Sequence, residues 1–315
     1  MTKVKPLHIA YSDAYLDWKL GTVDNEHPSN PVRAQLATRK LVKLYPDSVI
    51  LDPIPKARDA VRLMDTHPVD YITNVVNDGV STEWPGTQPE LGETALTMFA
   101  GTVRCVDAVL NGDADVAFNP QGAKHHAQYD YASGFCVFND FAWAAQEFVK
   151  RGWRVLYIDI DAHHGDGVEN LTRHMPMVTT ASIHDGTIFP GTGRSGHTPE
   201  LGVYNWAFEA DSGDAELNEA MLQIEQLADE IKPDIILLAA GADGHETDPL
   251  ATLNYSVEGY RRAAEIVANI AIQHAQGRVL VGGAGGYTPF DVTPTVWATV
   301  VSTIYNSVQA SKTLI

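Results

Sequence analysis

Short apolar runs rich in β-branched residues alternate along this chain with longer segments whose apolar positions recur every three or four residues. The first pattern predicts buried strands and the second predicts amphipathic helices. Strands are expected at Leu7–Tyr11, Ser48–Leu51, Val116–Phe118, Arg154–Ile160, Met177–Ile183, Asp234–Gly241 and Arg278–Val281. Helices are expected at Pro31–Leu44 (with Asn30 as its cap), Ala57–Asp65, Leu91–Leu110, Phe138–Lys150, Asp214–Glu230, Ser256–Ala275 and Thr293–Val308. This alternation predicts an α/β fold, a parallel sheet with helices on both faces.

Three segments lack either pattern and are expected to be loops. Trp18–Pro28 is a polar loop, and the Gly- and Pro-containing segments Asp78–Pro89 and Gly186–Gly202 are predicted to form a rim. No internal repeat, low-complexity tract or linker interrupts the chain. We therefore expect one domain spanning residues 1–315.

Composition narrows the class of protein. The chain has 315 residues, of which 44% are hydrophobic, with no apolar window long enough to span a membrane and no apolar signal core after the charged start. Its two cysteines, Cys105 and Cys136, form no disulfide framework, which favours a reducing cytoplasm. A net charge of −18 argues against direct nucleic-acid binding and favours cationic partners such as lysine-rich peptides or polyamines. The oligomeric state stays open.

The strand Arg154–Ile160 runs directly into a cluster of carboxylates and imidazoles. Alternation along an extended segment places Asp159, Asp161 and His163 on one face, at the end of a strand where α/β sheets bind ligands. Asp243 follows the second strongly buried strand. A single carboxylate after a strand is often only a helix cap, but Asp161, His163 and Asp243 together make the donor set of a catalytic zinc site with one open position.

Two adjacent imidazoles, His125 and His126, follow the strand Val116–Phe118. A lone histidine is more often a hydrogen-bonded core residue than a catalyst. Here Asp159 and Asp166 flank the metal motif, and a carboxylate behind each imidazole would fix its tautomer and raise its basicity. Two imidazoles beside a metal suit amide hydrolysis, because the metal activates water and one imidazole takes its proton. Tyr287, after a Gly-rich run, is either a turn residue or a donor to the oxyanion.

Six stretches, in order, resemble the zinc-dependent histone deacetylase family of the arginase–deacetylase superfamily, which also includes acetoin-utilisation and acetylpolyamine amidohydrolase-like proteins. They are Gly122-Ala-Lys-His-His-Ala127, Ser133–Asp140, Asp159–Gly167, Phe189-Pro-Gly-Thr-Gly193, Gly241-Ala-Asp243 with Asp248-Pro-Leu250, and the glycines before Tyr287. The resemblance implies the arginase–deacetylase fold. It implies one Zn²⁺ held by Asp161, His163 and Asp243, with His125 and His126, backed by Asp159 and Asp166, as general base and acid. Tyr287 would polarise the acetyl carbonyl.

The resemblance also implies features that the residues alone do not. A narrow tunnel for an acyl-lysine stem would be lined by Gly134, Phe135, Phe189 and Leu250. A K⁺ ion would bind beside the zinc at the positions that match the family, partly through backbone carbonyls: Asp159, Asp161, His163, Ser182 and Ile183. Glu83 is the counterpart of a rim aspartate that grips the substrate backbone. Leu250 replaces a methionine common in the nuclear enzymes, a change that conserves volume.

Several functions compete. The first is hydrolysis of an N-acetyl amide on an acetylated lysine peptide or similar amine, and its nearest alternative is an acetylpolyamine or other small-molecule amidohydrolase. A binuclear manganese ureohydrolase of the arginase branch would need an acid two residues after His163, where this chain has Gly165. A non-catalytic acyl-lysine binder would not need both histidines and Tyr287. These features favour a zinc-dependent amidohydrolase.

Overall fold

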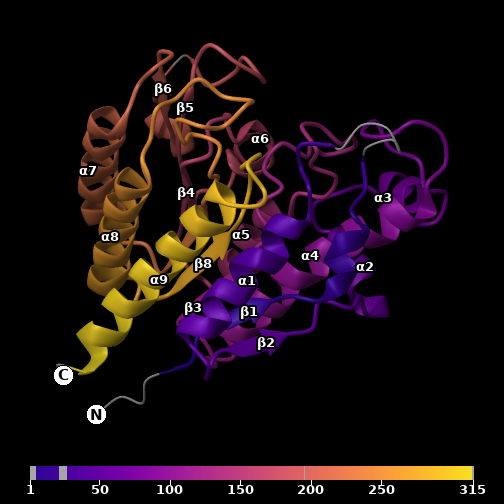
Figure 1. Cartoon of the computed structure of the whole chain (residues 1–315), viewed down its shortest axis with the longest axis horizontal. Helices are drawn as coiled ribbons and strands as arrows, with labels where there is room; N and C mark the ends of the chain where they lie inside the picture. The colour runs from indigo at the N-terminus through magenta and orange to yellow at the C-terminus, as the bar shows by residue number, and fades with distance from the viewer. Residues whose placement is uncertain (1–4, 21–26, 195, 314–315) are drawn as a thin grey trace.

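Figure 1 shows a computed structural model of the chain, which describes residues 5–20, 27–194 and 196–313. Across these residues eight parallel strands form one sheet in the order β2-β1-β3-β8-β7-β4-β5-β6. The strands are β1 (His8–Ala10), β2 (Val49–Leu51), β3 (Val116–Asn119), β4 (Val155–Asp159), β5 (Val178–Asp185), β6 (Val203–Phe208), β7 (Ile235–Ala239) and β8 (Val279–Gly282). The α/β prediction is confirmed.

Helices cover both faces of the sheet (Figure 1). One layer runs side by side through α1 (Val32–Leu44), α9 (Val292–Thr313), α8 (Val257–His274) and α7 (Asp214–Ile231). The other contains α4 (Pro89–Leu110), α5 (Asp140–Lys150) and α6 (Asp166–Thr172), with α2 (Ala57–Leu63) and α3 (Val69–Val76) packed on α4. Two short 3₁₀ segments, η1 (Asp13–Asp17) and η2 (Pro199–Leu201), lie in connections.

Each face of the sheet has its own apolar core, because successive side chains of a strand point to opposite sides. In β4, Leu156 and Ile158 pack toward the α7–α9 layer, whereas Val155 and Tyr157 pack toward the α4–α5 layer. All four side chains are buried. A strand buried on both faces reads as one continuous apolar run, which is why the sequence pattern identifies β4 and β7.

The order of the strands determines where the polar loops meet. The four neighbouring strands β3, β8, β7 and β4 occupy the middle of the sheet. In the sequence they are followed by His125 and His126, by Tyr287, by Asp243, and by Asp161 and His163, respectively. Because the strands are parallel, these four loops emerge at one edge of the sheet. Residues up to 162 positions apart are brought together there.

Most predicted elements occur with small differences at their ends, and some differ more. The pattern places the end of the last helix near Val308, but α9 continues to Thr313. Strand β4 ends at Asp159, so alternation does not place Asp161 and His163 on a common strand face with Asp159, and that inference is wrong. The sequence pattern did not identify α3, α6, β6 or the two 3₁₀ segments. Pro31, not Asn30, occupies the N-cap position of α1, although Asn30 Oδ1 does accept from the Val32 N–H over 3.0 Å.

Two expectations concern loops and membranes. The polar loop expected at Trp18–Pro28 lies partly outside the described residues, and within them Trp18 is buried. Asp78–Pro89 and Gly186–Gly202 consist largely of turns and irregular backbone where they are described. Among the described residues, none of the helices combines the length and apolar content that a bilayer span demands. Whether the chain is a single domain stays a prediction.

Candidate metal centre and active site

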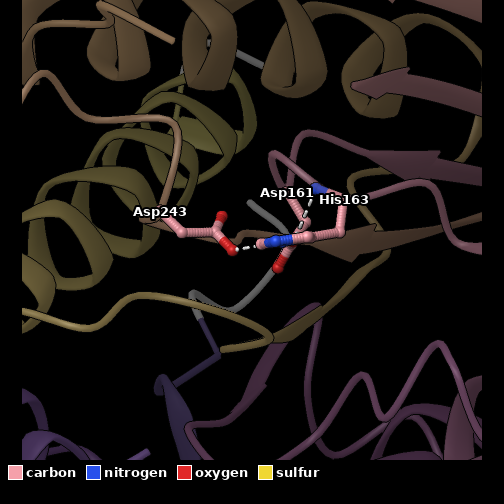
Figure 2. A group of neighbouring side chains, drawn as sticks. All are labelled: Asp161, His163 and Asp243. Atoms are coloured by element: carbon pink, nitrogen blue, oxygen red, sulfur yellow. Dashed lines mark hydrogen bonds and ion pairs between the residues drawn. The ribbon is translucent and has the colours of Figure 1, made fainter. Parts of the chain in front are cut away.

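Asp161, His163 and Asp243 converge at the end of the central strands (Figure 2). One potential ligand atom from each lies within 4.8 Å of the others. His163 Nδ1 is 3.1 Å from Asp161 Oδ1 and 2.9 Å from Asp243 Oδ2. Both carboxylates are fully buried. Two acids and an imidazole from two different loops therefore aim at one point.

The backbone fixes the directions of both carboxylates. The Ala162 N–H donates to Asp243 Oδ1 over 2.9 Å, and the Gly285 N–H donates to Asp161 Oδ2 over 2.6 Å. A Cβ at Gly285 would lie 2.1 Å from Asp243 Oδ2, so a side chain at this position would displace the carboxylate. The approach of the Gly285 backbone thus explains one glycine of the run before Tyr287.

The charges at this site fit a bound cation. Burial opposes protonation of His163, but its hydrogen bonds to Asp161 and Asp243 outweigh it and raise its pKa to about 11. Burial and the nearby charge of Asp161 raise the pKa of Asp243 to about 7. A proton on the imidazole partly balances the buried carboxylates, and a divalent cation would balance both of them. Two carboxylates and one imidazole nitrogen are donors that zinc accepts.

His125 and His126 lie beside this group, each with a carboxylate behind it. His125 Nδ1 is 2.8 Å from Asp159 Oδ2, and His126 Nδ1 is 2.7 Å from Asp166 Oδ1. The centroids of the two rings are 4.0 Å apart, and the His126 ring is 6.0 Å from that of His163. Each Nδ1 faces its carboxylate, which leaves the Nε2 atoms for other partners.

The two histidines differ in their electrostatic surroundings. Burial opposes the charge on His125, but Asp159 and Asp161 outweigh it and raise its pKa to about 9. Burial lowers the pKa of His126 to about 4, with the charge of His125 acting in the same direction. Near neutral pH His126 is therefore neutral and can accept a proton, whereas His125 is protonated and can donate one.

Tyr287 approaches the same point from the loop after β8. Its ring centroid is 6.5 Å from that of His163. Burial and the charges of Asp243 and Asp161 raise the pKa of its phenol far above 10, so the hydroxyl keeps its proton. The backbone is held from two sides, because the Tyr287 N–H donates to Asp248 Oδ2 over 2.7 Å and Arg33 Nη1 donates to the Gly286 carbonyl over 2.6 Å.

Three of the four expected tunnel residues, Gly134, Phe135 and Phe189, lie next to these groups. The Phe135 ring lies 6.1 Å from that of Tyr287, and the Phe189 ring lies 5.0 Å from that of His126. A Cβ at Gly134 would be 2.4 Å from His126 Cδ2, so the backbone there contacts the imidazole closely. Phe189 is 49% exposed and Leu250 is 40% exposed, as wall residues near an opening would be.

Comparison with known proteins agrees with this geometry. The model of the histone deacetylase domain matches residues 27–304. Acetoin utilization protein AcuC of Staphylococcus aureus is 32% identical over 317 residues, covering 92% of this chain and 79% of its own length. AcuC of Bacillus subtilis is likewise 32% identical, over 92% of this chain and 80% of its length. Histone deacetylase clr6 of Schizosaccharomyces pombe is 31% identical over 84% of this chain and 69% of its length.

The chain belongs to the histone deacetylase family. A family model that spans most of the described sheet and helices carries this assignment, and the relatives support a deacetylase. The eight-stranded parallel sheet is consistent with the arginase–deacetylase fold.

The structure also shows where two further sets of predicted residues lie, namely the K⁺ positions and the rim residue Glu83. Among the predicted K⁺ positions, Asp159 of β4 pairs in register with Ser182 of β5, Ile183 follows Ser182, and Asp161 and His163 lie in the loop after β4. Binding of K⁺ there stays a prediction. Glu83 contacts one of the expected tunnel residues, because its Oε2 accepts from the Phe135 N–H over 2.8 Å. Its expected contact with substrate stays a prediction.

Sequence reasoning missed several residues that shape the site. Asp248 and Gly285 stand within recognised motifs, yet their roles depend on contacts with distant loops. Arg33 and Lys124 are buried and line a cavity of about 20 Å³ together with His125 and Tyr287. Burial lowers the pKa of Lys124 to about 8. The available signal for Lys124 was its place directly before His125.

Proposed function

We propose that this protein is a zinc-dependent deacetylase that hydrolyses the N-acetyl amide of an acetyl-lysine side chain to the free amine and acetate. Asp161, His163 and Asp243 would hold one Zn²⁺, which when bound polarises the amide carbonyl and lowers the pKa of water. K⁺ would bind beside the zinc at Asp159, Asp161, His163, Ser182 and Ile183, partly through backbone carbonyls. The observation that carries the proposal is the pair of adjacent, carboxylate-backed imidazoles beside a buried acidic donor set.

The two histidines divide the proton transfers. With its Nδ1 proton directed at Asp166, neutral His126 presents the Nε2 lone pair and accepts the proton of the attacking water. Gln128 Nε2 donates to Asp166 Oδ2 over 2.8 Å and so orients this carboxylate. His125, kept cationic by Asp159, stabilises negative charge and can donate a proton to the leaving amine.

Tyr287 supplies the remaining polar contact. Its phenol keeps its proton and can donate a hydrogen bond to the oxygen on which negative charge develops. Phe135 and Phe189 would enclose the apolar methylene stem of the side chain, which leaves little room for branching. The buried positions of His125 and His126 limit the access of bulk water to the reacting amide.

Acetate release by the purified, zinc-loaded protein tests the proposal. Acetyl-lysine peptides and acetylated polyamines are assayed side by side, with and without a hydroxamate chelator. Hydroxamate-sensitive release from peptides is expected. Release only from polyamines would instead identify the small-molecule amidohydrolase of the alternative. No release from either substrate with zinc bound would refute the deacetylase.

A further inference from the structure

Two tight turns from distant parts of the chain face each other beside the active site. One is closed by a bridge between Ser81 and Trp84, and the other by a bridge between Ser133 and Cys136. Thr82 Oγ1 donates to the Ala132 carbonyl over 2.6 Å. Glu83 Oε2 accepts from the N–H of Phe135, the third residue of the second turn, over 2.8 Å. The first turn therefore holds the second at its backbone.

The second turn has an unfavourable backbone conformation. Gly134 has φ +56° and Phe135 has φ +64°, so both lie in the left-handed region. Glycine adopts this conformation readily, whereas a residue with a Cβ such as phenylalanine does so at a cost in energy. Such a conformation persists only when surrounding contacts impose it. The hydrogen bond to Glu83 is a contact made directly to the backbone of the strained residue.

The same turn packs against the catalytic groups. The Phe135 ring meets the Tyr287 ring edge-on at 6.1 Å and the His27 ring at 4.4 Å. The Gly134 backbone is so close to His126 that an added Cβ would overlap the imidazole. Relaxation of the turn would therefore move a wall of the tunnel relative to both His126 and Tyr287.

The Glu83 carboxylate is suited to this contact. It is partly buried, and burial raises its pKa, while the Phe135 N–H opposes that rise by stabilising the charged form. A charged acceptor makes a stronger hydrogen bond than a neutral one. Its partner is fixed within the chain, so the contact forms before any substrate arrives.

We propose that Glu83 is a positioning residue, which holds Gly134 and Phe135 in the left-handed turn that shapes the tunnel beside His126 and Tyr287. This role rests on the proposed deacetylase function. It differs from the rim role expected from sequence, in which Glu83 would contact the substrate backbone. A positioning residue affects every substrate that enters the tunnel, whereas a rim contact affects only substrates with a peptide backbone to grip.

Two substrates and two variants separate these roles. Glu83→Ala and Glu83→Gln are assayed on an acetyl-lysine peptide and on N-acetylbutylamine, which has the acetyl amide and an alkyl stem but no peptide backbone. We expect Glu83→Ala to lower kcat on both substrates by about tenfold. Glu83→Gln should recover most of the loss, because its amide oxygen can still accept from Phe135. Glu90→Ala, an exposed glutamate at the start of α4, is the matched control.

A loss confined to the peptide and expressed in KM would overturn the positioning role in favour of the rim contact. An unchanged kcat in Glu83→Ala would overturn it as well. Metal content and thermal stability of each variant show whether a loss reflects misfolding instead.

Amide hydrogen exchange of the segment 133–136 provides a readout that does not depend on activity. Glu83→Ala should lose protection at Phe135, while Glu83→Gln should retain it. Unchanged exchange in Glu83→Ala would refute the contact itself. If the wild-type protein is inactive on both substrates, the deacetylase function fails. Loss of protection at Phe135 in Glu83→Ala would still show that Glu83 holds the turn.

Discussion

The carboxylate of Asp248 accepts a hydrogen bond from the backbone N–H of Tyr287 over 2.7 Å. Its second oxygen accepts from the Leu250 N–H over 2.9 Å. One side chain thus joins the loop after β8, which presents Tyr287, to the loop that carries Leu250. Arg33 Nη1 donates to the carbonyl of the neighbouring Gly286. The position of the phenol depends on these contacts.

Replacing Asp248 should therefore slow the reaction without removing the metal. Asp248→Ala loses both acceptors, and we expect kcat to fall by about tenfold, the effect of one lost charge-assisted hydrogen bond. Asp248→Asn keeps one acceptor oxygen, so its kcat should lie between those of the wild type and Asp248→Ala. Steady-state kinetics would measure kcat, and elemental analysis would measure the metal content. Glu246→Ala, at an exposed glutamate of the same loop, is the control. Wild-type kcat in Asp248→Ala would show that Tyr287 is positioned by other contacts.

Binding of zinc should release protons. In the metal-free site His163 is protonated between Asp161 and Asp243, since its pKa is raised to about 11. A metal at Nδ1 must displace that proton, and Asp243, whose pKa is raised to about 7, also carries part of a proton near neutral pH. We therefore expect release of about one to two protons per zinc. Calorimetry in buffers of different ionisation enthalpy would count them. Absence of proton release would contradict the assignment of Nδ1 as a ligand atom.

Asp161→Ala tests the same ligand set by a different route. It removes one donor and leaves His163 and Asp243, so we expect the purified variant to contain little or no zinc under conditions that load the wild type. Elemental analysis after dialysis gives the ratio of metal to protein, and circular dichroism checks the fold. Full retention of zinc would mean that the ligands are assigned wrongly.

His67, a buried histidine outside the candidate ligand set, should make the fold sensitive to acid. His67 Nδ1 lies 2.9 Å from the Tyr129 carbonyl, and its Nε2 accepts from the Asn139 N–H over 2.9 Å. The ring therefore donates at one nitrogen and accepts at the other, which only neutral imidazole can do. Burial lowers its pKa from 6.5 to about 4.

The sign of the pH dependence follows from proton uptake. Between about pH 6.5 and pH 4 the unfolded chain binds a proton at His67 that the folded chain does not, so this group's contribution is complete above pH 6.5 and is lost as the pH falls toward 4. The slope is about 1.4 kcal/mol per pH unit for one proton. Urea unfolding of wild type and His67→Gln across this range should show a shallower slope in the variant. Equal slopes would exclude His67 as the cause.

The sequence predicts much of the centre of the fold because β4 and β7 are buried on both faces and contain almost only apolar residues. The edge strand β6 escapes detection because it mixes tyrosine, asparagine and tryptophan, and only two of its six residues, Val203 and Asn205, are buried. The seven-residue helix α6 begins at Asp166, inside the metal motif, so its residues suggest chemistry rather than a helix.

The site divides in a similar way. Asp161, His163 and Asp243 are recognisable because each closely follows a strong strand, and the ends of parallel strands meet. Glu83 and Asp248 are different, because each accepts from a backbone N–H of a loop far away in sequence, at Phe135 and Tyr287. No local sequence pattern identifies such a partner. These hydrogen bonds can be identified only once the structure shows which loops lie next to each other.

The two groups closest to the proposed chemistry should show different kinetic effects. His126→Ala removes the imidazole that accepts the proton of water, and Tyr287→Phe removes only the hydroxyl that donates to the developing oxyanion. Each should lower kcat by about 10²-fold or more, with the fold and the zinc content retained. The pH profile separates them, because only His126→Ala should abolish the rise of kcat/KM on the acidic limb. Unchanged turnover in either variant, on a substrate that the wild type hydrolyses, would refute the role given to that residue.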